Sequence, residues 1–223
     1  MRDIAQNLKQ ITATLPAGVR LVAVSKFHPV EALMQAYSAG QRIFGENRAQ
    51  EMQAKHPQMP ADVEWHFIGH LQTNKVRAIA PFVSLIHSVD SPRLLRTIDD
   101  EARRAGRTID VLLELHVAQE ATKSGMTPNE CLALADSQTL AEAANVRVRG
   151  VMGMASLTSD TGLVRREFHT IRATFERLKS GRFATDPLFN EVSMGMSDDY
   201  TIAIEEGATL VRIGTSIFGP REY

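Results

Sequence analysis

The feature that most constrains this chain is a regular alternation of short apolar segments with longer amphipathic ones. Eight apolar segments read as buried strands, and each of the first seven is followed by apolar residues at helical spacing. The expected strands are residues 21–25, 42–45, 65–69, 83–87, 109–115, 146–151, 191–193 and 210–213. This order of elements predicts a parallel sheet with its helices outside, because right-handed crossovers place them there.

Eight βα units favour a closed (β/α)₈ barrel over an open doubly wound sheet, which stays as the alternative. A barrel of this type takes about 250 residues, and the chain has 223. A helix over about residues 1–15 precedes the first strand, with Ile4, Leu8 and Ile11 on one face. No segment rich in Pro, Gly or Ser divides the chain, so we expect one α/β domain over residues 1–223.

Charge and cysteine content exclude several classes of function. The chain has 25 Lys and Arg against 26 Asp and Glu, so non-specific binding to nucleic acid or an anionic membrane is not expected. Cys131 is the single cysteine, which rules out an internal disulfide and fits a reducing compartment. No apolar run approaches the roughly 20 residues that span a bilayer. We therefore expect a cytoplasmic protein that binds no membrane.

In a barrel of this type, catalytic and binding residues follow the strands. Lys26 comes directly after the first expected strand, where its ammonium group would face a partly desolvated mouth. Desolvation lowers a lysine pKa and so raises the fraction of free amine. A free amine is what a Schiff base with an aldehyde requires. The plainer alternative is a lysine that extends from the rim into solvent.

The loops after the last two strands are the recurrent phosphate site of such barrels. Ser193, Gly214 and Thr215 lie there, and small residues let backbone N–H groups approach an anion. Both segments also read as ordinary helix caps. Ser197 is expected to cap the next helix, with the acids at 198–199 in its first turn and facing away from the phosphate.

A lysine at a strand end opposite a phosphate loop predicts an aldehyde ligand that carries a phosphate. Pyridoxal 5'-phosphate is one such ligand, and a sugar phosphate bound by an aldolase is another. The pattern of residues leaves both open.

Six motifs in this order resemble those of the pyridoxal-phosphate-binding homeostasis proteins, the YggS or PROSC family. They begin at the first strand and extend to the C-terminal part of the chain. The matching segments are residues 21–26, 44–47, 66–69 with 71–75, 123–126, 193–199, and 211–215 with 217–219. Some positions depart from the family pattern, among them Arg48 and His70, which stand where an aromatic residue and a proline are common.

The resemblance implies a barrel like the N-terminal domain of alanine racemase, the fold of type III pyridoxal phosphate enzymes. It implies a Schiff base on Lys26 and a phosphate held by Ser193, Gly214 and Thr215. Arg212 would face the pyridine nitrogen. The remaining implied cofactor contacts are Asn47, Met194 and Ser197.

Arg212 bears on activity, because a permanent cation beside the pyridine nitrogen disfavours its protonation and weakens the ring as an electron sink. The barrel uses the chain length, which leaves no room for the second domain of a racemase. We therefore expect a cofactor buffer or carrier without robust turnover, a monomer that binds no metal, with pyridoxal-phosphate-dependent apo-enzymes as possible partners. The alternatives are a small racemase or Schiff-base lyase, with a base among His66, His70 and His116, and a regulatory partner protein.

Overall fold

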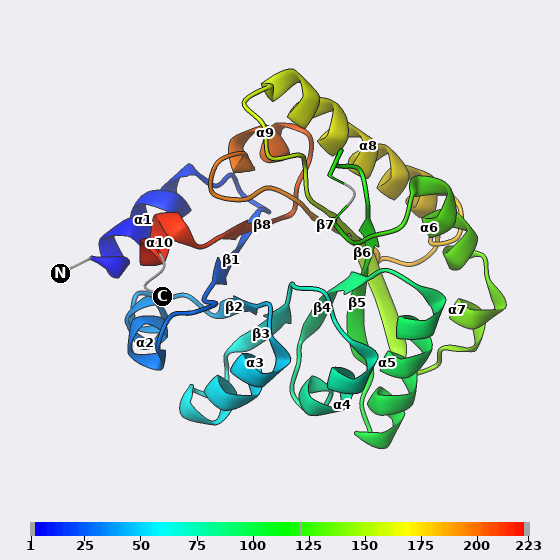
Figure 1. The fold of residues 1–223 in the computed structure, drawn as a ribbon, viewed down its shortest axis with the longest axis horizontal. Coiled ribbons are helices and arrows are strands. Elements are labelled where there is room, and N and C mark those ends of the chain that lie inside the picture. The colour runs from blue at the N-terminus through cyan, green and yellow to red at the C-terminus, as the bar shows by residue number, and fades with distance from the viewer. Residues whose placement is uncertain (1–2, 121, 221–223) are drawn as a thin grey trace.

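The computed structural model describes residues 3–120 and 122–220 and contains a closed barrel of parallel strands surrounded by helices (Figure 1). Each strand pairs with the next along the chain, and β1 pairs with β8 to close the barrel. The strands are β1 (Arg20–Val24), β2 (Ile43–Glu46), β3 (Glu64–Phe67), β4 (Leu85–Val89), β5 (Ile109–Leu115), β6 (Val146–Gly153), β7 (Glu191–Ser193) and β8 (Leu210–Ile213).

Helices cover the outside of this barrel, and α1 and α10 lie together beside β1 and β8 (Figure 1). The α-helices are α1 (Ile4–Thr14), α2 (Val30–Ser38), α3 (Ala49–Lys55), α4 (Val76–Ile79), α5 (Pro92–Arg104), α6 (Pro128–Ala135), α7 (Gln138–Glu142), α8 (Thr161–Ser180), α9 (Tyr200–Glu205) and α10 (Thr215–Phe218). Two 3₁₀ turns, η1 (His56–Gln58) and η2 (Thr73–Lys75), complete the described elements.

The closed barrel confirms the fold class that the alternation predicted and excludes the open sheet. The bounds of β5, β7 and β8 agree with the expected strands, and the others differ by one or two residues at an end. The largest shift is in β4, which was expected over residues 83–87 and lies at Leu85–Val89. Short elements such as α7 and α10 were not predicted, because four or five residues carry too little periodicity.

Two layers of apolar packing hold the barrel, because successive side chains of a strand point to opposite faces. Inside the barrel lies a small cluster of Val22, Ile43, Leu85, Leu112, Met152 and Leu210. The much larger cluster lies between the strands and the helices. It includes a stack of aromatic rings in which the ring centroid of Phe189 lies 4.2 Å from that of Phe183 and 5.0 Å from that of Phe175.

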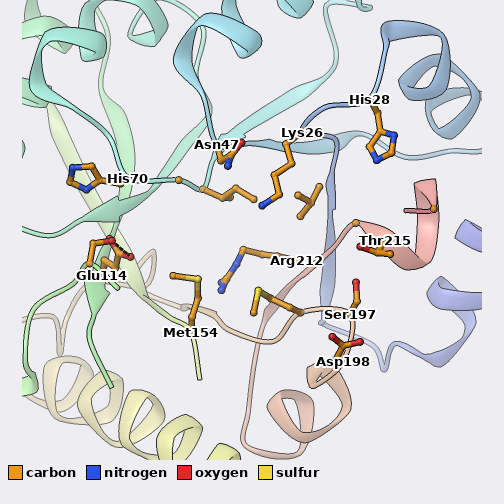
Figure 2. Close-up of a pocket in the computed structure, with 17 residues that line it drawn as sticks. Lys26, His28, Asn47, His70, Glu114, Met154, Ser197, Asp198, Arg212 and Thr215 are labelled. Atoms are coloured by element: carbon orange, nitrogen blue, oxygen red, sulfur yellow. Dashed lines mark hydrogen bonds between the residues drawn. The ribbon is translucent and has the colours of Figure 1, made fainter. Parts of the chain in front are cut away.

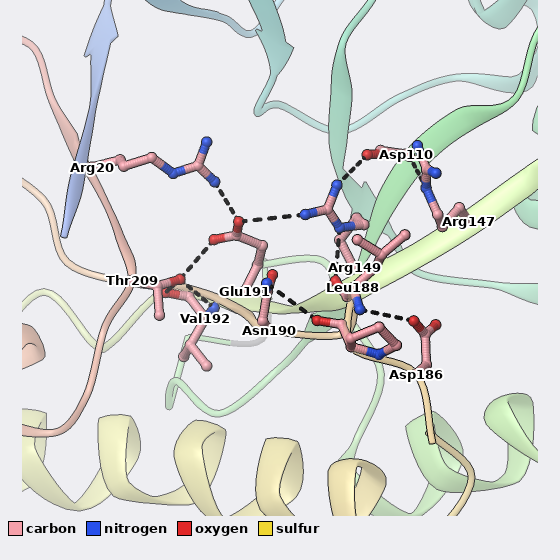
Figure 3. A network of polar contacts seen from close by, with 11 residues as sticks. Arg20, Asp110, Arg147, Arg149, Asp186, Leu188, Asn190, Glu191, Val192 and Thr209 are labelled. Carbon is pink, nitrogen blue, oxygen red and sulfur yellow. Dashed lines mark hydrogen bonds and ion pairs between the residues drawn. The ribbon is translucent and has the colours of Figure 1, made fainter. Parts of the chain in front are cut away.

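Ion pairs and hydrogen bonds join the N-terminal ends of the strands, opposite the expected site (Figure 3). Glu191 of β7 forms an ion pair with Arg20 of β1 and accepts a 2.8 Å hydrogen bond from Thr209. Asp110 of β5 bonds Arg147 and Arg149 of β6 at 2.7 and 2.6 Å. These contacts tie together strands that are far apart in the sequence.

Gly150 in β6 is required by the close approach of β7. Its φ is +154°, and a Cβ there would lie 1.8 Å from the carbonyl oxygen of Glu191. No side chain fits at that distance, and the conformation itself favours glycine.

Candidate functional site

A pocket of about 380 Å³ lies where the C-terminal ends of the strands meet (Figure 2). Residues from the ends of β1, β2, β3, β5, β6, β7 and β8 contribute to it. Its lining comprises Val24, Lys26, His28, Asn47, Ile68, Gly69, His70, Glu114, Ser124, Met154, Met196, Ser197, Asp198, Arg212, Gly214, Thr215 and Gly219. The structure thus brings together six of the eight residues predicted for the site, all except Ser193 and Met194.

Lys26 extends into this pocket from a tight turn that follows β1 (Figure 2). The next residue, Phe27, has a φ of 66°, a left-handed conformation that is uncommon for a non-glycine residue. The turn is held from behind, because the Phe27 N–H donates a 2.6 Å hydrogen bond to Glu51 of α3. The Ser25 carbonyl accepts a 2.8 Å hydrogen bond from Lys55 of the same helix.

Lys55 and Glu46 form a buried ion pair directly behind the Lys26 turn. The Lys55 Nζ lies 2.7 Å from Glu46 Oε1 and 2.7 Å from Glu51 Oε1. The Glu46 carboxylate also accepts a 2.7 Å hydrogen bond from the Ser25 hydroxyl. Burial raises the pKa of Glu46, and the adjacent Lys55 ammonium acts in the opposite direction. Sequence reasoning did not find this pair, since neither residue follows a strand into the pocket.

Arg212 of β8 forms the cationic floor of the pocket (Figure 2). Its guanidinium is buried and donates to the carbonyl and the hydroxyl of Ser193 at 2.8 and 2.7 Å, and to the Gly153 carbonyl at 3.0 Å. Burial lowers the pKa of Arg212 to about 10, so it stays charged at neutral pH. A guanidinium has five N–H donors. Within the described part of the chain, two of them remain for a ligand.

Ser193 lies under Arg212 and does not line the pocket. Its buried hydroxyl is 2.9 Å from Nδ1 of His87, and His87 Nε2 is 3.0 Å from Nδ1 of His66. Burial lowers the pKa of His66 to about 3 and that of His87 well below its usual range, so both rings are neutral. The hydroxyl accepts a hydrogen bond from Arg212, and its contact with His87 links Ser193, His87 and His66 in one buried hydrogen-bonded chain. Ser193 therefore orients the arginine, and its expected contact with a phosphate stays a prediction.

Met194 is fully buried in the core cluster that surrounds the barrel. The methionines that line the pocket are Met154 and Met196. The Met194 side chain therefore does not line this pocket, and its expected contact with a ligand stays a prediction.

Ser197 and Thr215 lie together at one end of the pocket, the end expected for a phosphate (Figure 2). Gly214, which precedes Thr215 in the chain, also lines the pocket. Gly214 packs closely on β1, since a Cβ there would lie 3.0 Å from the Val24 carbonyl oxygen. The expectation that both following acids face away is wrong for Asp198, which is exposed but lines the pocket.

The expected helix cap is also wrong, because α9 begins at Tyr200 with Asp199 as its N-cap residue. The Asp199 carboxylate accepts a 2.5 Å hydrogen bond from the backbone N–H of Met196. This bond closes the loop after β7 and leaves Ser197 directed to the pocket, as Figure 2 shows.

Asn47 reaches the pocket from the end of β2. Its amide oxygen is buried and has no hydrogen-bond partner among the described residues. Gly69 packs against it, since a Cβ at position 69 would lie 2.5 Å from the Asn47 carbonyl oxygen. An unpartnered amide oxygen is costly when it is buried. The amide oxygen of Asn47 is therefore a hydrogen-bond acceptor that the described residues leave unused.

The three histidines considered as bases lie in different places. His66 is buried inside the barrel, and His116 bonds the Lys123 carbonyl at 2.7 Å through Nδ1. His70 alone of the three lines the pocket, and its Nδ1 lies 3.4 Å from an Asp90 oxygen. Residues that sequence reasoning missed in the pocket include His28, Glu114 and Ser124. Glu114 is the penultimate residue of the strand predicted over residues 109–115, close to the strand end, and an argument similar to that for Lys26 could have found it.

Two further searches bear on the chemistry of the described residues. Over residues 3–120 and 122–220, no group of three or more His, Cys, Asp or Glu side chains is placed to hold a metal ion. In the same residues, no helix is long and apolar enough to cross a membrane.

The sequence matches known proteins over its length. The family model of the alanine racemase N-terminal domain matches residues 1–222. The pyridoxal phosphate homeostasis protein of Vibrio alginolyticus is 37% identical over 238 residues, which cover 100% of both chains. That of Escherichia coli is 37% identical over 240 residues, covering 100% of this chain and 99% of its own.

Solved structures agree with these relatives. PipY of Synechococcus elongatus without pyridoxal phosphate is 38% identical, with a TM-score of 0.90 over 97% of this chain and 100% of PipY. The structure of PipY with pyridoxal phosphate bound gives 37% identity and a TM-score of 0.87 over the same shares.

Alanine racemase of Clostridium difficile shares the fold alone, at 12% identity and a TM-score of 0.76 over 96% of this chain and 56% of the racemase. The family model matches residues 1–222, and the relatives are 37% identical over the full length of this chain. The matched region therefore includes the sequence motifs, the barrel strands and the pocket that contains Lys26. This chain belongs to the family of pyridoxal phosphate homeostasis proteins.

Proposed function

We propose that this chain holds pyridoxal 5'-phosphate as a Schiff base on Lys26 and serves as a buffer or carrier of the cofactor. The observation that carries the proposal is that one pocket is lined by Lys26, Arg212 and Asn47, together with Ser197 and Thr215 at its other end. The family name and the cofactor-bound structure of PipY support it.

The pocket residues fit the parts of this cofactor. The lysine amine condenses with its aldehyde, and Ser197, Gly214 and Thr215 hold its phosphate at the opposite end. The free donors of Arg212 face the pyridine nitrogen, and the unpartnered oxygen of Asn47 accepts from the ring hydroxyl. Ser193 acts on the cofactor through Arg212, which it holds with two hydrogen bonds.

The position of Arg212 favours the function of a cofactor carrier over that of an enzyme. A charged arginine at the pyridine nitrogen keeps that nitrogen unprotonated, and an unprotonated ring stabilises a carbanion poorly. Besides Lys26, the pocket side chains that could transfer a proton are those of His28, His70, Glu114 and Asp198, so the choice between carrier and enzyme rests on Arg212. Of the three histidines considered, only His70 lines the pocket, and the side chain of His70 is 61% exposed. A racemase or Schiff-base lyase remains the second candidate, with His70 as its acid or base.

The binding proposal is tested by absorbance spectra of the wild type and of Lys26→Ala with added pyridoxal phosphate. We expect a visible band in the wild type that borohydride removes, and no such band in the variant. An equal band in both proteins, or none in either, contradicts the assignment of Lys26.

The carrier proposal is tested on the loaded protein. Incubation with amino acids is expected to give no racemisation or elimination above that of free cofactor, and an apo-enzyme added to the loaded protein is expected to regain activity. Brisk turnover that His70→Ala abolishes would support the enzyme instead. Size-exclusion chromatography with light scattering tests the expected monomer.

A further inference from the structure

Glu114, at the end of β5, lines the pocket, and one of its two carboxyl oxygens has no hydrogen-bond partner among the described residues. The residue is 2% exposed, and its Oε1 accepts a 3.0 Å hydrogen bond from the Ser124 hydroxyl. Its Oε2 is buried and has no hydrogen-bond partner among the described residues. A buried carboxyl oxygen without a donor is costly, because it has lost its water and gained nothing in exchange.

The place of Glu114 in the pocket separates it from the proposed phosphate end. In Figure 2, Glu114 and His70 lie on one side of Arg212, and Ser197 and Thr215 lie on the other. In the described part of the chain, no Lys, Arg or His nitrogen lies within 4.0 Å of the Glu114 carboxylate. Arg212 acts on it only through space.

The surroundings of Glu114 combine acceptors with an apolar wall. Ser124 adds a hydroxyl, and Asp90 is close enough to act on Glu114 as a like charge. The apolar side chains of Ile68 and Met154 also line this pocket. Oxygen acceptors at the end of an apolar wall suit an ammonium group on an alkyl stem. They suit an anion poorly, because it would meet the Glu114 carboxylate, and Asp90 adds a second negative charge nearby.

We propose that the Glu114 end of the pocket is a subsite for the primary ammonium group of an alkylamine. The ammonium donates to Glu114 Oε2 and to the Ser124 hydroxyl, and its stem lies along Ile68 and Met154. A hydrogen bond from a cation to a carboxylate is about twice as strong as one between neutral groups. This inference goes beyond the proposed function, since it concerns an amine that binds without the cofactor.

The subsite has a defined dependence on pH. Burial raises the pKa of Glu114, with Asp90 adding to the rise, while Ser124, Arg212 and His70 act in the opposite direction. A carboxyl group with a raised pKa loses its proton as the pH increases toward neutrality. Amine affinity therefore increases with pH over this range and is weakest under acidic conditions, where Glu114 is neutral.

The test is calorimetric titration of the full-length protein, freed of cofactor, with n-butylamine. Butanol and butyrate serve as neutral and anionic probes of similar shape. We expect butylamine to bind at pH 8 and more weakly at pH 5, and the other two probes to show no measurable binding. This series uses only the wild type and does not depend on the folding of a variant.

Glu114→Gln keeps the shape and removes the charge, and Asp198→Asn removes a carboxylate from the other end of the pocket. We expect Glu114→Gln to weaken butylamine binding by at least about tenfold. Asp198→Asn is expected to change it by less than about threefold, since exposed charges act weakly at a distance. Circular dichroism checks that both variants are folded.

The proposal is overturned if butylamine does not bind the wild type, if butanol binds as well, or if both variants lose affinity equally. The last result would show attraction by net charge alone. The absorbance band of Lys26 is recorded separately, so loss of amine binding with the band intact refutes the subsite and leaves the cofactor proposal standing.

Discussion

Removal of the Lys55 ammonium tests how the turn that carries Lys26 is held. The Lys55→Met variant keeps the apolar stem and leaves Glu46 inside the protein without its 2.7 Å partner. The Ser25 carbonyl also loses its 2.8 Å hydrogen bond. Breaking a buried pair by removing one partner destabilises a protein by about 3–5 kcal/mol. We expect a loss in this range at pH 7.

Protonation of Glu46 limits the electrostatic part of this loss. Its ordinary pKa is 4.5, and each pH unit above that value costs about 1.4 kcal/mol to keep the carboxyl neutral. The cost of keeping Glu46 neutral, which is the upper limit of the electrostatic loss, is thus about 3 kcal/mol at pH 7 and below about 1 kcal/mol at pH 5. A group whose pKa is raised by folding binds more protons in the native state, so its contribution to stability falls as the pH rises. The variant should therefore be least destabilised in acid.

Urea unfolding of the wild type, Lys55→Met, Glu46→Gln and the double variant at pH 5 and pH 7 measures these quantities. We expect the double variant to be more stable than the sum of the single losses allows, because Gln leaves no buried charge. Additive losses, or a loss by Lys55→Met below about 1 kcal/mol at pH 7, would refute the reasoning about the buried pair.

Three further predictions concern other parts of the barrel. Gly150→Ala should cost more than about 2 kcal/mol in urea unfolding, because its Cβ would lie 1.8 Å from the Glu191 carbonyl oxygen; a stable variant contradicts that approach. Burial raises the pKa of Cys131 to about 12, so a thiol reagent at pH 8 should label it far more slowly in the native protein than in urea. Folding lowers the pKa of His66 to about 3, so the unfolded chain binds more protons below about pH 6.5. The neutral rings of His66 and His87 should thus cost the native state about 2 kcal/mol or more at pH 5, and the free energy of unfolding should show no such loss in a His66→Asn, His87→Asn variant.

The architecture followed from local information. Strand and helix periods alternate so regularly that a parallel barrel was the favoured arrangement, and residues that follow strands meet at one end of it. Lys26, Asn47, Ser197, Arg212, Gly214 and Thr215 were accordingly predicted together and lie together. Their roles toward a cofactor came from the resemblance to a family and stay proposals.

The placement of individual side chains within that end depended on the folded barrel. Ser193 was assigned to the phosphate because it follows a strand, but in the structure its side chain is bonded to His87 in the barrel interior. Alternation along a strand fixes only that neighbours face opposite ways. Which of them reaches the pocket depends on where the strand ends relative to its neighbours, and β7 has only three residues.

The sequence by itself determined the order of elements and the strand ends at which chemistry gathers, because periodicity and strand-end position are local properties. It favoured the closed barrel, and the pairing of β1 with β8 in the structure excluded the open sheet. Only the tertiary structure decided that Lys55 pairs with Glu46 behind Lys26. It also decided that Glu114, which lines the pocket, has one buried oxygen with no hydrogen-bond partner among the described residues. Contacts of this kind depend on side chains that approach within about 3 Å across different strands and helices. No spacing along the chain encodes that distance.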